Sequence, residues 1–138
     1  MKYISYVLLV TALVFSSGSY ADVAVIVNTA NGNAISDNDI SRLFLGKLKK
    51  FGNGESATPV NSKASSAARV EFEEKVLKKS SSQIKAYWSK RIFSGKGKPP
   101  KELDGDAAII AFIASNPGAV GYVSSANVND TVKVVKTF

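Results

Sequence analysis

Residues 59–72 read PVNSKASSAARVEF, which predicts the end of a strand, a tight turn of small polar residues and the first turns of a helix. Hydroxyl and amide oxygens in such a turn accept from backbone N–H groups that have no partner inside the helix. The alanines leave those N–H groups accessible, and a Lys and an Arg place positive charge on either side. Together these groups suit an oxyanion such as phosphate, although an ordinary capped helix fits the same residues. The candidate ligand-binding residues are Ser62, Lys63, Ser65, Ser66, Ala67, Ala68 and Arg69.

The first 21 residues have the pattern of a secretory signal. Lys2 is their one charge, an apolar run covers residues 6–15, and Ser19 and Ala21 are small residues at the place where a signal peptidase cleaves. A membrane anchor is the alternative, but the run is shorter than a spanning helix needs. We expect a signal peptide at 1–21, cleavage after Ala21, and a periplasmic α/β domain at 22–138.

Composition narrows the classes of partner and of chemistry. From Asp22 onward the chain has 17 basic and 11 acidic side chains, a net charge of about +6. This charge favours anionic partners, namely small anions, acidic polymers or anionic membrane surfaces, and export removes the usual nucleic-acid target. The chain has no Cys and no His, which excludes disulfides, His/Cys zinc sites and catalytic triads with a His base. We expect neither a cofactor nor a metal.

Apolar patterning predicts three layers, with a sheet between helices. The nearly unbroken apolar run at 22–28 is typical of a strand that is covered on both faces. Further strands are predicted at 58–61, 119–123 and 131–137, and helices at 36–45, 66–79, 82–94 and 107–115. Pro59 makes its strand tolerant of an edge position, and we expect the aromatic face of the helix at 82–94, Ile92 included, to lie in the core. The order β-α-β-α-α-α-β-β fits a three-layer α/β domain.

Two short motifs raise the alternative of a serine enzyme. Residues 82–85 fit S-x-x-K and residues 36–38 fit S-D-N, as in penicillin-recognising enzymes. Here they occur in reverse order, and the third element at 136–138 has Phe where Gly is needed. The domain is also too small for that fold. Both serines fit helix caps, so we expect no enzyme.

Four segments carry motifs of a known family. Residues 40–47 are similar to its "IFLGK" helix end, 59–72 to its strand–turn–helix, 86–100 to an "AYW…F-x-GKGxPP" signature, and 115–123 to "NPGAIGYV". Together they resemble the periplasmic phosphate-binding proteins of ABC transporters, specifically their short single-lobe relatives. The resemblance implies a single lobe of the type II periplasmic binding-protein fold, with a mixed, mostly parallel sheet flanked by helices. In the full-length family, phosphate lies between two such lobes.

The family's key motif, R-x-D-G-S-G-T at a helix start, aligns with residues 62–68. The motif's Arg pairs with phosphate through two parallel hydrogen bonds, and its Asp favours a protonated phosphate. The motif's Arg, Asp, Ser and Thr positions hold Ser62, Ala64, Ser66 and Ala68 in this chain.

Two functional hypotheses follow. In the first, the chain binds phosphate or a similar oxyanion for phosphate ABC transport, through backbone N–H groups, Ser hydroxyls and the cation of Lys63 or Arg69. Its partners would be an ABC permease or another periplasmic protein, and a homodimer would complete the site. In the second, the lobe has lost its ligand and is a periplasmic interaction or scaffold module. The cationic loop at 96–101 fits a docking surface and a solvated loop equally.

Overall fold

Strand β1 (Val23–Asn28) opens the described part of the chain, which is residues 22–138 of this computed structural model. The predicted signal peptide and its cleavage after Ala21 lie outside the described residues. All six residues of β1 are buried, because strands flank both of its edges and helices cover both faces of the sheet. The apolar run therefore forms the doubly covered strand that it predicts.

Within residues 22–138 the sheet has five strands in the order β3-β2-β4-β1-β5. Strand β2 (Thr58–Ser62) runs parallel to β3 (Lys101–Leu103) and to β4 (Ala119–Ser124). Strand β1 runs antiparallel to β4 and to β5 (Val132–Thr137). Parallel strands need a long crossover connection, and the helices between β2 and β4 supply it. The predicted mixed α/β sheet is confirmed, with parallel pairing in two of its four strand pairs rather than in most of them.

Strand β2 lies inside the sheet, although Pro59 predicts tolerance of an edge. Its second neighbour, β3, was not predicted, because a three-residue strand after two prolines and several lysines has no apolar pattern. Pairing between β2 and β3 begins only at Val60. Proline has no backbone N–H, but no hydrogen bond to β3 is needed at residue 59. The proline therefore fits an interior strand at this one position.

Serine side chains cap the helices on one face of the sheet. Ser36 and Ser66 are caps, as predicted. The third cap is Ser80 rather than Ser82, because Ser80 and Gln83 exchange hydrogen bonds in a capping box. The helical elements of residues 22–138 are α1 (Asp37–Phe44), α2 (Ala67–Phe72), the π-helical turn η1 (Glu73–Leu77), α3 (Ser81–Phe93), α4 (Asp106–Ser115) and the 3-10 turn η2 (Ser125–Asn127).

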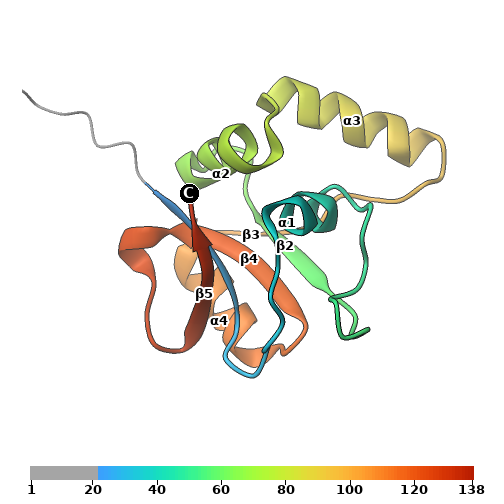
Figure 1. The fold of residues 1–138 in the computed structure, drawn as a ribbon. Coiled ribbons are helices and arrows are strands. Elements are labelled where there is room, and N and C mark those ends of the chain that lie inside the picture. The colour runs from blue at the N-terminus through green and yellow to red at the C-terminus, as the bar shows by residue number, and fades with distance from the viewer. Residues whose placement is uncertain (1–21) are drawn as a thin grey trace, which may run out of the picture.

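The predicted three layers are confirmed (Figure 1). Alternate residues of β1 point to opposite faces. Val23, Val25 and Val27 join a core cluster with α1, α2, η1 and α3, whereas Ala24 and Ile26 join a second cluster with α4. In the described part of the chain, no helix has the length and apolar character needed to cross a bilayer.

The outer end of α3 departs from the predicted core. Ile84 and Trp88 are buried as expected, but Ile92 is 55% exposed. The prediction was wrong for Ile92 because α3 packs against the end of α1 through Trp88, which lies close to Gly46, and then continues past the body of the protein (Figure 1). Helical spacing does not reveal where a supporting neighbour ends.

Gly118 offers a test of how β2 and β4 meet. Its carbonyl accepts from the N–H of Thr58 at 2.8 Å, and a Cβ at Gly118 would lie 2.7 Å from the Ser56 carbonyl oxygen. Because backbone must move to relieve that clash, we expect Gly118→Ala to lower the free energy of unfolding by about 1–3 kcal/mol in urea denaturation. The matched control is Gly32→Ala, where the added Cβ has no neighbour within 4 Å. Equal midpoints for the two variants would contradict this account of the packing.

Candidate oxyanion site at the start of helix α2

Helix α2 begins at an exposed turn that follows the buried end of β2. The N–H of Ser66 donates to the Lys63 carbonyl at 2.9 Å, which closes the turn. The Ser66 hydroxyl then accepts from the N–H of Arg69 at 3.4 Å. The N–H groups of Ala67 and Ala68 belong to the first helical turn and have no partner inside the helix. The start of α2 therefore presents two backbone donors and one hydroxyl at its tip.

These groups open into a hollow of about 230 Å³. Its other walls come from the start of β1, the end of β4 and the start of α4, so three separate segments meet at the tip of α2. The lining residues are Asp22, Val23, Ser66, Ala67, Ala68, Asp106 and Ser124.

The hollow carries carboxylates and its lining includes no Lys or Arg. Asp106 is held in place, because its Oδ2 accepts from the N–H of Ser124 at 3.0 Å and from Nδ2 of Asn127 at 2.8 Å. Negative charge at this position opposes a fully ionised oxyanion, while a carboxylate oxygen can accept from a protonated one. Among residues 22–138, no group of three or more His, Cys, Asp or Glu side chains could hold a metal ion.

The two predicted cations point elsewhere and are paired with carboxylates. Nζ of Lys63 lies 3.3 Å from Oδ2 of Asp104, on the surface. The Arg69 guanidinium contacts Glu102 at 2.6 Å and Glu73 at 3.4 Å, and it donates to the Ser62 carbonyl at 3.0 Å. The structure thus groups Ser66, Ala67 and Ala68 at one hollow, while Ser62 and Arg69 belong to a separate cluster and Lys63 and Ser65 are exposed.

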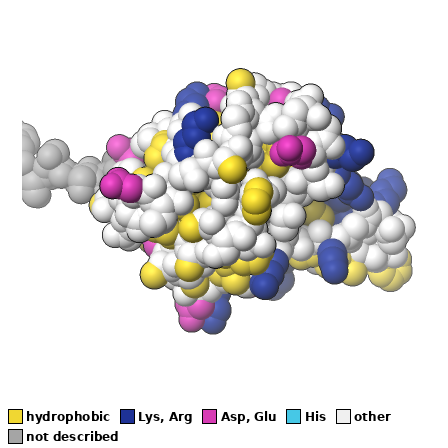
Figure 2. Space-filling model, turned by 90° about the horizontal axis from the view of Figure 1, so that it is seen from below, with side chains coloured by type: hydrophobic (Ala, Val, Ile, Leu, Met, Phe, Trp, Pro, Cys, Tyr) yellow, Lys and Arg dark blue, Asp and Glu magenta, His cyan; other side chains and the backbone are white. Residues whose placement is uncertain are grey.

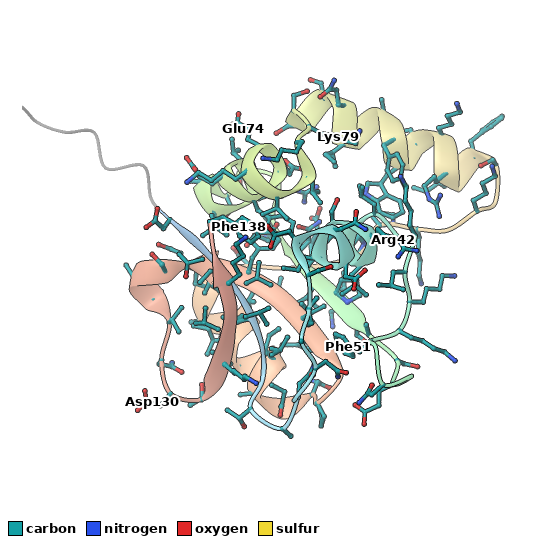
Figure 3. The ribbon with its side chains drawn as sticks, in the orientation of Figure 1. Arg42, Phe51, Glu74, Lys79, Asp130 and Phe138 are labelled. Carbon is teal, nitrogen blue, oxygen red and sulfur yellow. The ribbon has the colours of Figure 1, made fainter. Side chains whose placement is uncertain are left out.

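Arg69 and Glu73 form a largely buried ion pair whose side chains are 11% and 4% exposed. Burial lowers the pKa of Arg69, but its hydrogen bond to Glu102 and the negative charges nearby outweigh burial and leave the pKa above its ordinary value. Glu73 also accepts from the Ser81 hydroxyl at 3.1 Å, which ties η1 to α3. Figure 3 shows the neighbouring Glu74 pointing outward from the helices instead. The i, i+4 spacing of Arg69 and Glu73 is the sequence signal that could have revealed this pair.

Tyr122 fixes the buried end of β2, and sequence reasoning assigned it no role at the site. Its hydroxyl accepts from the N–H of Ser62 at 3.1 Å and donates to Oδ1 of Asn61. Its ring stacks on Phe72, with centroids 3.9 Å apart. Burial raises the pKa of Tyr122 well above its ordinary value. The last turn of α2 and the end of β2 are thus held by one aromatic side chain of β4.

Removing the Arg69 cation from this ion pair should strongly lower the stability of the protein. Arg69→Met leaves Glu73 buried without its partner, and we expect the free energy of unfolding to fall by about 3–5 kcal/mol. Adding Glu73→Gln to this variant removes the unpaired charge and should restore most of the loss. Lys63→Met is the matched control, since its exposed pair is worth about 1 kcal/mol or less. If Arg69→Met is as stable as Lys63→Met in urea denaturation, the structural role of Arg69 is wrong.

Tyr122 predicts an alkaline loss of stability. The pKa of Tyr122 is raised by folding, so its stabilisation is fully present below the unfolded pKa of about 10 and is lost as the pH rises beyond it. Tyr122→Phe should cost about 1–3 kcal/mol at pH 7, because the buried N–H of Ser62 loses its acceptor. The difference from wild type should then shrink above pH 10. Unfolding free energies that stay parallel from pH 7 to pH 11 would contradict this.

The similarity of this chain to known proteins lies in its fold and is not detected in its sequence. No protein-family model and no curated protein matches the chain. Among solved structures, an ABC-type phosphate transport receptor from Vibrio cholerae matches with a TM-score of 0.66 at 18% identity, over 85% of this chain and 47% of that one. A putative phosphate ABC transporter substrate-binding protein with bound phosphate, from Clostridium perfringens, matches with a TM-score of 0.65 at 22% identity, over 85% of this chain and 46% of that one.

A possible phosphate-binding protein from Planctomyces limnophilus matches with a TM-score of 0.59 at 16% identity, over 85% of this chain and 42% of that one. The chain spans less than half the length of each of these three structures. The chain therefore has a fold similar to that of one part of these phosphate ABC transport proteins.

Proposed function

We propose that this chain is an exported phosphate-binding-protein-like domain that binds inorganic phosphate or a similar oxyanion at the start of α2. The observation that carries the proposal is the Ser66-capped helix tip, which opens into a hollow on a fold shared with phosphate receptors. The N–H groups of Ala67 and Ala68 would donate to phosphate oxygens, and the Ser66 hydroxyl proton is available as a third donor. These three residues are the part of the predicted site that lies together.

Asp106 gives the proposed site a selectivity. In the aligned family motif the acidic position falls on Ala64, which has no carboxylate. Asp106 reaches the same hollow from α4 instead, held by Ser124 and Asn127. A carboxylate there would accept the P–O–H of a protonated phosphate and would repel sulfate, which carries no proton at neutral pH.

The hollow would need a second surface to enclose its ligand. The chain spans less than half the length of the phosphate receptors it resembles, and in this proposal the ligand is held between the hollow and a second surface. A second copy of the chain, an ABC permease or another periplasmic protein would supply the missing wall. We place the domain at 22–138, in the periplasm after cleavage at Ala21, and assign no catalytic residue, since the structural relatives are transport-related binding proteins.

One observation favours the second hypothesis, an interaction module without a ligand. Both candidate cations are already paired, Lys63 with Asp104 and Arg69 with Glu73 and Glu102. Only backbone and hydroxyl donors then remain for an anion, and Asp22 and Asp106 face them. Because these two carboxylates oppose the uncharged donors, the affinity of the hollow for an anion would then be too weak to measure.

Calorimetric titration with inorganic phosphate, with sulfate alongside, tests the proposal on residues 22–138. Saturable heat that is selective for phosphate and persists at 0.5 M salt is expected, since exposed charge alone would be screened (to a Debye length of roughly 4 Å). Ser66→Asp should abolish that heat, because Asp caps a helix as well as Ser does while its charge repels the anion.

The matched control is Ser80→Asp, which makes the same change at the cap of α3. It should leave the phosphate heat unchanged. Equal binding by Ser66→Asp and wild type would refute the site. Heat that is absent, or shared with sulfate and lost in salt, would favour the interaction module.

A further inference from the structure

The last turn of α3 holds two exposed apolar side chains. Phe93 is 96% exposed and Ile92 is 55% exposed, the highest values among the large hydrophobic residues of the described chain. Figure 1 shows this end of α3 projecting beyond the body of the protein. Phe93 stands outside the hollows on this side, whose linings include Ile92 and Lys98. Ile92 and Phe93 together form an exposed apolar patch on a projecting element, and such patches are where interaction sites occur.

The segment around this apex has only positive charge. Residues 75–101 contain nine Lys or Arg and no Asp or Glu, so half of the chain's 18 basic residues lie in 27 positions. Lys90, Lys96 and Lys98 surround the apex in sequence and are exposed, and no ion pair in residues 22–138 involves them. Figure 2 shows dark-blue side chains gathered towards the side where α3 projects, with yellow side chains beside them.

Side chains of α3 hold the helix against the rest of the domain, so its exposed end has a fixed position. The Tyr87 hydroxyl donates to the Leu45 carbonyl at 2.6 Å. The Arg91 guanidinium donates to the Gly46 carbonyl at 3.5 Å. Trp88 in turn covers Gly46, and Ile84 is buried beneath the helix. The tip is therefore an exposed end on a rigid support rather than a loose segment.

We propose that this tip, Ile92 and Phe93 with Lys90, Lys96 and Lys98, docks the domain on an anionic lipid surface. Lysines are drawn to anionic headgroups, and an aromatic ring inserts at the boundary between headgroups and acyl chains. The exposure of Phe93 outside these hollows favours a lipid surface over a small anion, because small ligands are held in concave sites. The absence of acidic side chains from residues 75–101 supplies the charge complementarity. This inference uses none of the residues of the proposed phosphate site and stands or falls separately from it.

Vesicle flotation tests the proposal on residues 22–138, which hold every element of the described fold. We expect binding to vesicles of phosphatidylcholine with about 30% phosphatidylglycerol, little binding to pure phosphatidylcholine, and loss of binding in high salt. Phe93→Ser should weaken binding about tenfold. Lys96→Gln with Lys98→Gln should weaken it roughly 25-fold, at about fivefold for each charge.

Matched controls lie on β5, away from the tip (Figure 1). Val134→Ser removes a hydrophobic side chain that is 40% exposed, and Lys133→Gln with Lys136→Gln removes the same charge as the lysine pair above. Both should bind as wild type does. No binding to the anionic vesicles, or an equal loss from the β5 variants, would overturn the proposal, and the first result would point to an acidic protein partner.

Insertion of the Phe93 ring into the lipid can be measured separately from adsorption of the protein to the vesicle surface. Phe93→Trp places a fluorophore at the apex, while the native Trp88 is buried and serves as a constant background. A blue shift and protection from acrylamide on adding anionic vesicles would support insertion. A spectrum that stays unchanged while the protein floats with the vesicles would refute the role of Phe93.

Discussion

The guanidinium of Arg69 joins more separate parts of this domain than any helix cap does. It bonds to the Ser62 carbonyl on β2, to Glu102 on β3 and to Glu73 on η1. Glu73 then continues the network to Ser81 at the start of α3. A buried charge is tolerated only when it is paired and hydrogen-bonded, so this cluster fixes the mutual positions of two strands and two helices. The helix tip that we propose as an oxyanion site owes its place to that network, and for the same reason Arg69 is not free to meet an anion.

Much of the fold follows from patterns within single segments. The apolar run at 22–28, the serine caps at Ser36 and Ser66, and the three layers were predictable because apolar patterns and helix caps are set by residues that are close together in the sequence. Strand β3 was not, because a segment of three residues, two of them charged, becomes a strand only when β2 offers a free edge. The exposure of Ile92 was missed for a related reason, since helical spacing carries no information about where the supporting element ends.

The candidate site was predictable in part. Ser66, Ala67 and Ala68 lie together as the strand–turn–helix pattern indicates. The pattern could not reveal that Asp22 and Asp106 line the same hollow, or that Tyr122 holds Ser62 from β4, because these contacts join residues far apart in the sequence. The net charge of the chain also does not show that its acidic and basic groups lie on separate surfaces. Acidic groups face the tip of α2, whereas every charged residue of the segment 75–101, which includes α3, is basic.

The two edges of the sheet have a consequence for how copies of this chain can meet. Strand β3 has only three residues, two of them charged, and β5 carries Lys133 and Lys136 along its length. The shortness of β3 and the lysines of β5 discourage a second sheet from adding its strands, because pairing would give few hydrogen bonds at β3 and would bring like charges together at β5. Pairing of the sheet of one copy with the sheet of another is therefore disfavoured at both edges. A second copy that closes over the tip of α2 would have to approach through helices and loops rather than through a strand edge.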